Sequence, residues 1–142
     1  MRGHGLSVLE LSAVLQIGGD AGSTEGVIAL DVAAGGRSVA TATADGSIRL
    51  WTSASTRVQR ILKAHDGRVT ALAFSPAGGL LASAGEDGIV KLWNLRTGRG
   101  GQVLRGHSGP VRAISFSSDG QRLITAGQDG AIRIWTTAGT RE

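Results

Sequence analysis

A chain of 142 residues has the length of one domain, and its 41% hydrophobic and 18% charged residues are typical of a globular protein and exclude a disordered one. It contains no cysteine, which excludes disulfides and thiolate metal sites. The net charge of +4 comes almost wholly from arginine, 13 of the 15 basic residues, but it is spread along the chain and so indicates nucleic-acid binding only weakly.

The chain starts with an apolar stretch, Ser7 to Ile17, that superficially suggests a signal sequence. Glu10 interrupts this stretch, and it is too short to span a bilayer as a helix. We therefore expect a soluble, unprocessed, cytoplasmic protein without a membrane segment. In it, residues 1–26 supply a spare outer β-strand and a loop.

A period of 42 residues governs the rest of the sequence. It relates the three tryptophans, Trp51, Trp93 and Trp135, and also three Asp-Gly pairs and three valines that open apolar segments. A period of this length indicates repeated supersecondary units, each too small to bury its own apolar face. We expect the units at about residues 27–63, 64–105 and 106–142.

The first predicted strand of each unit begins at the repeated valine, at residues 27–32, 69–74 and 111–116. Apolar residues fill its positions one, four and six, and alanine always fills position three. This pattern predicts a strand with both faces largely buried, one of them against a close neighbour that requires a small side chain.

The second predicted strand covers residues 38–43, 80–85 or 122–127 and leads to an Asp-Gly pair, which predicts a hairpin with a two-residue type I′ turn. The third ends at the repeated tryptophan. A fourth, at residues 57–62 and 102–105, leads into the next unit. Four antiparallel strands with short turns make one propeller blade.

These units resemble the WD-repeat β-propeller family over nearly the whole chain. Ala64-His65 and Gly106-His107 stand where that family has its Gly-His pair, and the Asp-Gly hairpins and tryptophan endings also match. The residue after each tryptophan is threonine or asparagine instead of the aspartate that names the motif. The resemblance implies an all-β fold of three four-stranded antiparallel blades, a partial propeller that forms an open arc unless another chain completes it.

The family's structural hydrogen-bond network, carried over to matching positions, joins an indole, a hydroxyl, an imidazole and a carboxylate in each blade. In the second blade these are Trp93, Ser83, His65 and Asp87, and in the third they are Trp135, Thr125, His107 and Asp129. The first blade has Trp51, Thr41 and Asp45 but no histidine. We therefore expect the first blade to be the most loosely held.

The resemblance also implies that the loop before each first strand and the Asp-Gly hairpin project onto one rim around the central channel. Loops on a rigid scaffold are the usual place for binding specificity. We expect partner-binding residues there, and we expect the two arginines among them to be the main anchors. The six candidates are Asp66, Arg68, Glu86, Ser108, Arg112 and Gln128.

Serine, histidine and aspartate are the residue types of a hydrolytic triad, but here they recur at the repeat period together with a tryptophan. A catalytic site needs no copy in each blade, so the pattern favours a structural network and a protein that is not an enzyme. The three histidines have no metal-ligand spacing, and the glycine pairs form no phosphate-binding motif. We expect no metal and no cofactor.

Three blades cannot close into a ring, because propellers have about four to eight. Three resolutions stay open: the chain is the C-terminal part of a longer propeller, or two copies form a six-bladed homodimer in which each donates its Ser7–Ile17 strand, or a separate partner completes the arc. The sequence favours a non-catalytic protein–protein interaction scaffold with a protein or peptide partner. The alternative is a nucleic-acid-binding propeller segment that uses its arginine excess.

Overall fold

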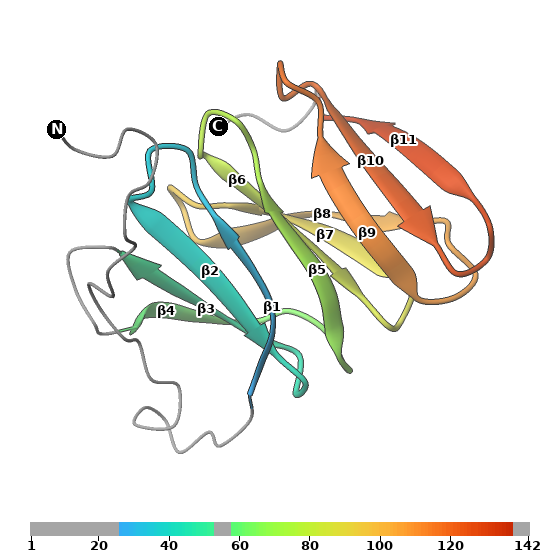
Figure 1. The fold of residues 1–142 in the computed structure, drawn as a ribbon, viewed down its shortest axis with the longest axis horizontal. Coiled ribbons are helices and arrows are strands. Elements are labelled where there is room, and N and C mark those ends of the chain that lie inside the picture. Colours follow the sequence, from blue (N-terminus) through green and yellow to red (C-terminus); the bar gives the residue numbers. More distant parts are fainter. Residues whose placement is uncertain (1–25, 53–57, 138–142) are drawn as a thin grey trace, which may run out of the picture.

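The computed structural model describes residues 26–52 and 58–137, and these ranges contain eleven β-strands and no helix. The strands form three antiparallel sheets that follow one another along the chain (Figure 1). The first sheet holds β1 (Val27–Val32), β2 (Ser38–Thr43), β3 (Ser47–Thr52) and β4 (Val58–Lys63). The second holds β5 (Val69–Phe74), β6 (Leu80–Gly85), β7 (Ile89–Asn94) and β8 (Arg99–Arg105), and the third holds β9 (Val111–Phe116), β10 (Arg122–Gly127) and β11 (Ile132–Thr136). The predicted all-β fold of antiparallel blades is confirmed.

Within each blade the strands are paired in chain order, so neighbours along the sequence are neighbours in the sheet. The third sheet has three strands among the described residues, and β11 stands at its edge. The spare strand predicted over Ser7 to Ile17 lies outside the described residues. The arc formed by the three sheets is open (Figure 1).

The core lies between the blades. The first strands β1, β5 and β9 run side by side (Figure 1), and the sheets pack face to face behind them. Ala40, Ala42 and Ile48 of the first blade pack against Leu72 and Phe74 of the second. A matching cluster joins the second blade to the third. The face of each blade thus depends on its neighbour for burial, as the repeat length predicts.

Two polar contacts also tie neighbouring first strands together. The backbone N–H of Phe74 in β5 donates to the Asp31 carboxylate in β1, at 2.7 Å. The Thr70 hydroxyl in β5 donates to the backbone carbonyl of Val111, at 2.5 Å. These bonds fix the register of each blade against the next, because a slip of one residue would break them.

The predicted type I′ turn at the Asp-Gly pairs is wrong. In the first blade the N–H of Gly46 donates to the carbonyl of Thr43, which places Ala44 and Asp45 at the centre of the turn. Gly46 follows them with φ of 89°. This is a three-residue loop that ends in a left-handed glycine.

The aspartate of the pair has a role of its own, because its carboxylate accepts the N–H two residues further on. The distances are 3.0 Å from Asp45 to Ser47, 3.1 Å from Asp87 to Ile89 and 3.1 Å from Asp129 to Ala131. Such a bond stabilises a turn locally.

Among the described residues, none belongs to a helix long and apolar enough to cross a membrane.

Candidate functional site

The second blade carries a chain of four side chains that joins two strands and two loops. The indole N–H of Trp93 on β7 donates to the Ser83 hydroxyl on β6, at 3.0 Å. Ser83 Oγ lies 2.9 Å from His65 Nε2, and His65 Nδ1 lies 3.3 Å from the Asp87 carboxylate. Burial lowers the pKa of His65, against the opposing pull of Asp87, so the imidazole is neutral at pH 7. A neutral ring can accept from Ser83 and donate to Asp87 at once.

The third blade repeats this geometry. Trp135 donates to Thr125 at 2.9 Å, and the Thr125 hydroxyl lies 2.8 Å from His107 Nε2. The Asp129 carboxylate lies 3.2 Å from His107 Nδ1 and also forms an ion pair with Arg133 at 3.2 Å. Backbone N–H groups, that of Ser108 first, hold the pKa of Asp129 well below its usual range.

The first blade provides hydrogen-bond partners for its tryptophan and its hairpin aspartate without a histidine. Trp51 donates to the Thr41 hydroxyl at 2.9 Å, as in the other blades. The fully buried Thr43 donates its hydroxyl to Asp45 at 2.7 Å and lowers the pKa of that carboxyl. Thr43 thus makes the bond to the aspartate that histidine makes elsewhere.

Sequence reasoning missed Thr43, although the 42-residue offset contains the signal. The positions equivalent to Thr43 are Gly85 and Gly127. A Cβ on Gly85 would overlap His65 Nδ1, and one on Gly127 would overlap His107 Nδ1. Glycine at this position therefore makes room for a histidine, and a larger residue there marks a blade built without one.

The Ser83–His65–Asp87 chain has hydrogen bonds in the order of a hydrolytic triad. Its hydroxyl, however, is fully buried and already accepts the Trp93 indole N–H. A nucleophile must face a space that a substrate carbonyl can enter. This geometry serves to satisfy buried polar groups, and the same holds for Thr125 in the third blade. Across the described ranges, no three acidic or histidine side chains gather as a metal site would require.

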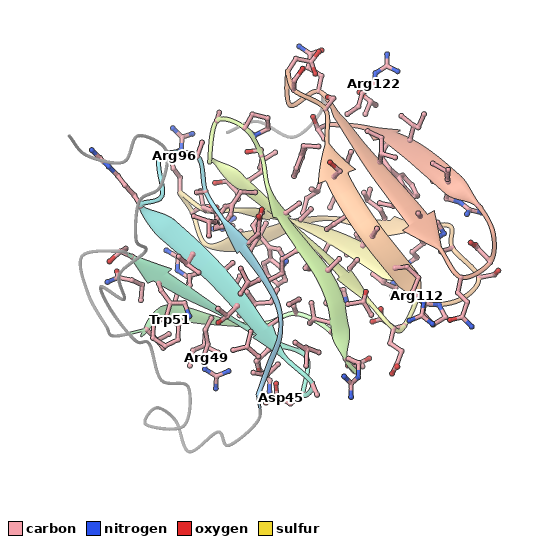
Figure 2. The ribbon with its side chains drawn as sticks, viewed as in Figure 1. Asp45, Arg49, Trp51, Arg96, Arg112 and Arg122 are labelled. Atoms are coloured by element: carbon pink, nitrogen blue, oxygen red, sulfur yellow. The ribbon has the colours of Figure 1, made fainter. Side chains whose placement is uncertain are left out.

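The six candidate rim residues are all exposed; five come from two kinds of loop, and Arg112 comes from a strand. Asp66, Arg68 and Ser108 lie before β5 or β9, Arg112 lies at the start of β9, and Glu86 and Gln128 lie beside the hairpins. Figure 2 shows Arg112 at the same end of the sheets as Asp45 of the first hairpin, and Arg96 and Arg122 at the opposite end.

Hydrogen bonds link the two kinds of candidate rim loop in the second and third blades. The N–H of Glu86 donates to the carbonyl of Arg68 at 2.9 Å, and the N–H of Gln128 donates to the carbonyl of Pro110 at 2.8 Å. The Arg112 guanidinium also donates to the side-chain carbonyl of Gln128. The backbone at these loops is therefore held in place, and Arg68 and Arg112 are exposed.

A small hollow of about 180 Å³, which sequence reasoning did not anticipate, lies at the end of the sheets away from the hairpins. Leu50 and Trp51 of the first blade line it together with Phe74 and Leu95 of the second, and Arg60 lies at the same hollow. The Arg60 guanidinium donates to the carbonyl of Leu95 at 3.4 Å. These residues are far apart in sequence, so no local pattern could indicate the hollow.

Three stacked antiparallel sheets with these networks define a segment of a β-propeller. The chain belongs to the WD domain, G-beta repeat family, whose sequence model matches residues 14–52, 56–94 and 98–136. The first match begins inside the N-terminal stretch predicted to form a strand.

Among solved structures, the chain is similar to U3-55K, with a TM-score of 0.79 at 22% identity, over 83% of this chain and 38% of that one. It is also similar to the WD40 repeats of RRP9, with a TM-score of 0.78 at 22% identity, over 83% and 37%. It therefore spans less than two fifths of either structure. A search of curated proteins finds no match. These likenesses establish the fold.

Proposed function

We propose that this chain is a non-catalytic protein-interaction scaffold that binds an acidic or extended peptide through its rim. The observation that carries the proposal is the contrast between a repeated frame and a varied rim. The Trp–hydroxyl bond recurs in all three blades, and the rim positions differ in charge and size between blades. The bond that stabilises the fold is the same in each blade, whereas the side chains that a partner would contact differ between blades.

Further blades complete the ring in this proposal, either on a longer chain of which this is a part or on a second copy. The chain's share of the propellers it resembles supports this. A cytoplasmic location is a further part of the proposal, consistent with the absence of cysteine.

The test is to replace Arg68 and Arg112 together with alanine and to measure binding of a labelled oligoglutamate peptide. We expect the double variant to lose about tenfold or more in affinity, because exposed arginines are frequent interface anchors. The matched control replaces Arg96 and Arg122 with alanine, which removes the same charge at the opposite end (Figure 2). Equal losses of affinity in both double variants would show that net charge alone causes the loss, and would contradict a rim site.

A labelled single-stranded oligonucleotide serves as the second probe, because arginine excess alone would favour phosphate. One outcome is that the oligonucleotide binds more tightly than the peptide, with an affinity that falls steeply as the salt concentration rises. That result would show that the proposed peptide partner is wrong and that the chain binds nucleic acid. Tighter binding of the peptide than of the oligonucleotide at the same salt concentration supports the scaffold proposal.

A further inference from the structure

The two ends of the arc expose side chains that are buried at the same repeat position inside it. On β1, Leu30 is 60% exposed, and its equivalent Leu72 on β5 is 8% exposed. Ile28 and Val32 share this outward face of β1 and are also exposed. These three residues form what we name the leading face of the first blade.

The other end shows the same contrast. Ile132 and Ile134 on β11 are 71% and 63% exposed, and their equivalents Val90 and Leu92 on β7 are 0% and 1% exposed. Val90 and Leu92 are buried because they pack toward the third blade. Ile132 and Ile134 form what we name the trailing face.

The leading and trailing faces are the two halves of one interface that the chain itself contains twice. Between the first and second blades, Ile48 at a trailing-face position packs with Leu72 and Phe74 at leading-face positions. Between the second and third, Val90 and Leu92 take the trailing role. Each exposed face therefore carries apolar side chains at the same repeat positions that pack together at the internal interfaces.

We propose that the trailing face of one copy packs on the leading face of a second copy, and the reverse, so that two chains close a six-bladed ring. This deepens the proposed function by naming what completes the propeller. Propellers have about four to eight blades, so one copy gives too few and three copies give too many. Two identical arcs close by a two-fold rotation, which leaves neither face uncovered.

A polar contact at the internal interface has a counterpart at the proposed one. Asp31 on β1 accepts the N–H of Phe74 from the next blade at 2.7 Å. The residue that occupies the position of Asp31 in the third blade is Ser115, and the residue that occupies the position of Phe74 in the first blade is Val32. Ser115 is exposed, and its hydroxyl can accept the N–H of Val32 from the second copy.

The first experiment measures the mass of the full chain by light scattering at micromolar concentration. We expect twice the 14.5 kDa of one chain. Leu30→Glu and Ile134→Lys should each reduce the mass to that of a monomer. Mixed in equal amounts, they should restore the double mass, because one interface is then native and the other pairs a glutamate with a lysine.

The matched control is Val103→Glu, which puts the same charge on an exposed apolar residue of β8, in the middle blade and away from both faces. It should leave the dimer intact. A native chain of single mass, or a mixture that stays monomeric, would overturn the proposal.

A second experiment does not depend on the folding of the charged variants. The chain has no cysteine, so the double variant Val32→Cys with Ser115→Cys carries the only two thiols. Their strands, β1 and β9, belong to the outer blades of the arc, so oxidation should link two chains and stop at two. A product that stays monomeric contradicts the interface, and a ladder beyond two chains contradicts the closed ring.

The Arg68 and Arg112 double variant should keep the dimer mass. It therefore separates a failure of the proposed ring closure from a failure of the proposed rim site.

Discussion

At the scale of single residues, the position equivalent to Thr43 decides how a blade satisfies its hairpin aspartate. Glycine there admits the imidazoles of His65 and His107, whereas Thr43 fills the space and donates its own hydroxyl. The prediction that the first blade is the most loosely held took the absence of a histidine as a lost bond. The structure shows another donor in place, and the relative stability of that blade stays a prediction.

The buried His65 predicts a loss of stability in mild acid. Its pKa is lowered in the folded chain below the 6.5 of an exposed imidazole, so the unfolded chain binds the proton more readily. The free energy of unfolding should therefore be highest above pH 6.5 and fall as the pH drops below that value. Denaturant titrations at pH 7.5 and 5.5 measure the difference.

The control for this prediction is His65→Gln, which keeps hydrogen-bonding capacity without a charge. The variant should show a smaller difference between the two pH values than the native chain. An unchanged difference would assign the acid sensitivity to other groups. The Asp129 carboxyl contributes in a separate window, because its lowered pKa adds stability that is lost only at much lower pH.

At the scale of the elements, the hairpin of one blade holds the loop that leads into the next. The carbonyl of Gly46 accepts the N–H groups of Ala64 and His65, at 3.0 and 3.1 Å. A Cβ on Gly46 would overlap the carbonyl oxygen of His65. Glycine is thus required both for its positive φ and for the close approach of the two loops.

Gly46→Ala should therefore destabilise the chain more than a change at another left-handed glycine. Gly78 is the matched control, with φ of 84° and no atom within 4 Å of an added Cβ. Gly78→Ala should cost about 1–2 kcal/mol from the backbone alone. Gly46→Ala should cost at least about 1 kcal/mol more, from the steric overlap. Equal costs in thermal or denaturant unfolding would contradict the close approach.

The strands were largely predictable from the sequence, because three copies of one pattern average out local ambiguity. The repeated valines, alanines and tryptophans locate the first three strands of each unit to within a residue or two, but β8 begins at Arg99, three residues before its predicted start at residue 102. The hairpin type was mispredicted because the Asp-Gly pair fits two loop classes, and only the hydrogen bond from Gly46 to Thr43 distinguishes them. The pairing of Arg112 with Gln128 depends on side-chain geometry that spacing does not contain.

At the scale of the whole molecule, the described residues form an arc whose two ends repeat the halves of its inner interfaces. Sequence reasoning foresaw unsatisfied ends from the number of blades, but it did not identify which side chains they expose. The structure identifies these side chains, because residues at equivalent positions, such as Leu30 and Leu72, differ widely in exposure. Apolar faces of this kind mark interaction surfaces in soluble proteins.

The most direct measurement is the burial of Ile134 in a diffraction structure of the full chain. We predict six sheets around one axis, with the Ile134 side chain packed against Leu30 of the second copy and excluded from solvent. Three sheets standing alone, with Ile134 and Leu30 both in water, would contradict the account.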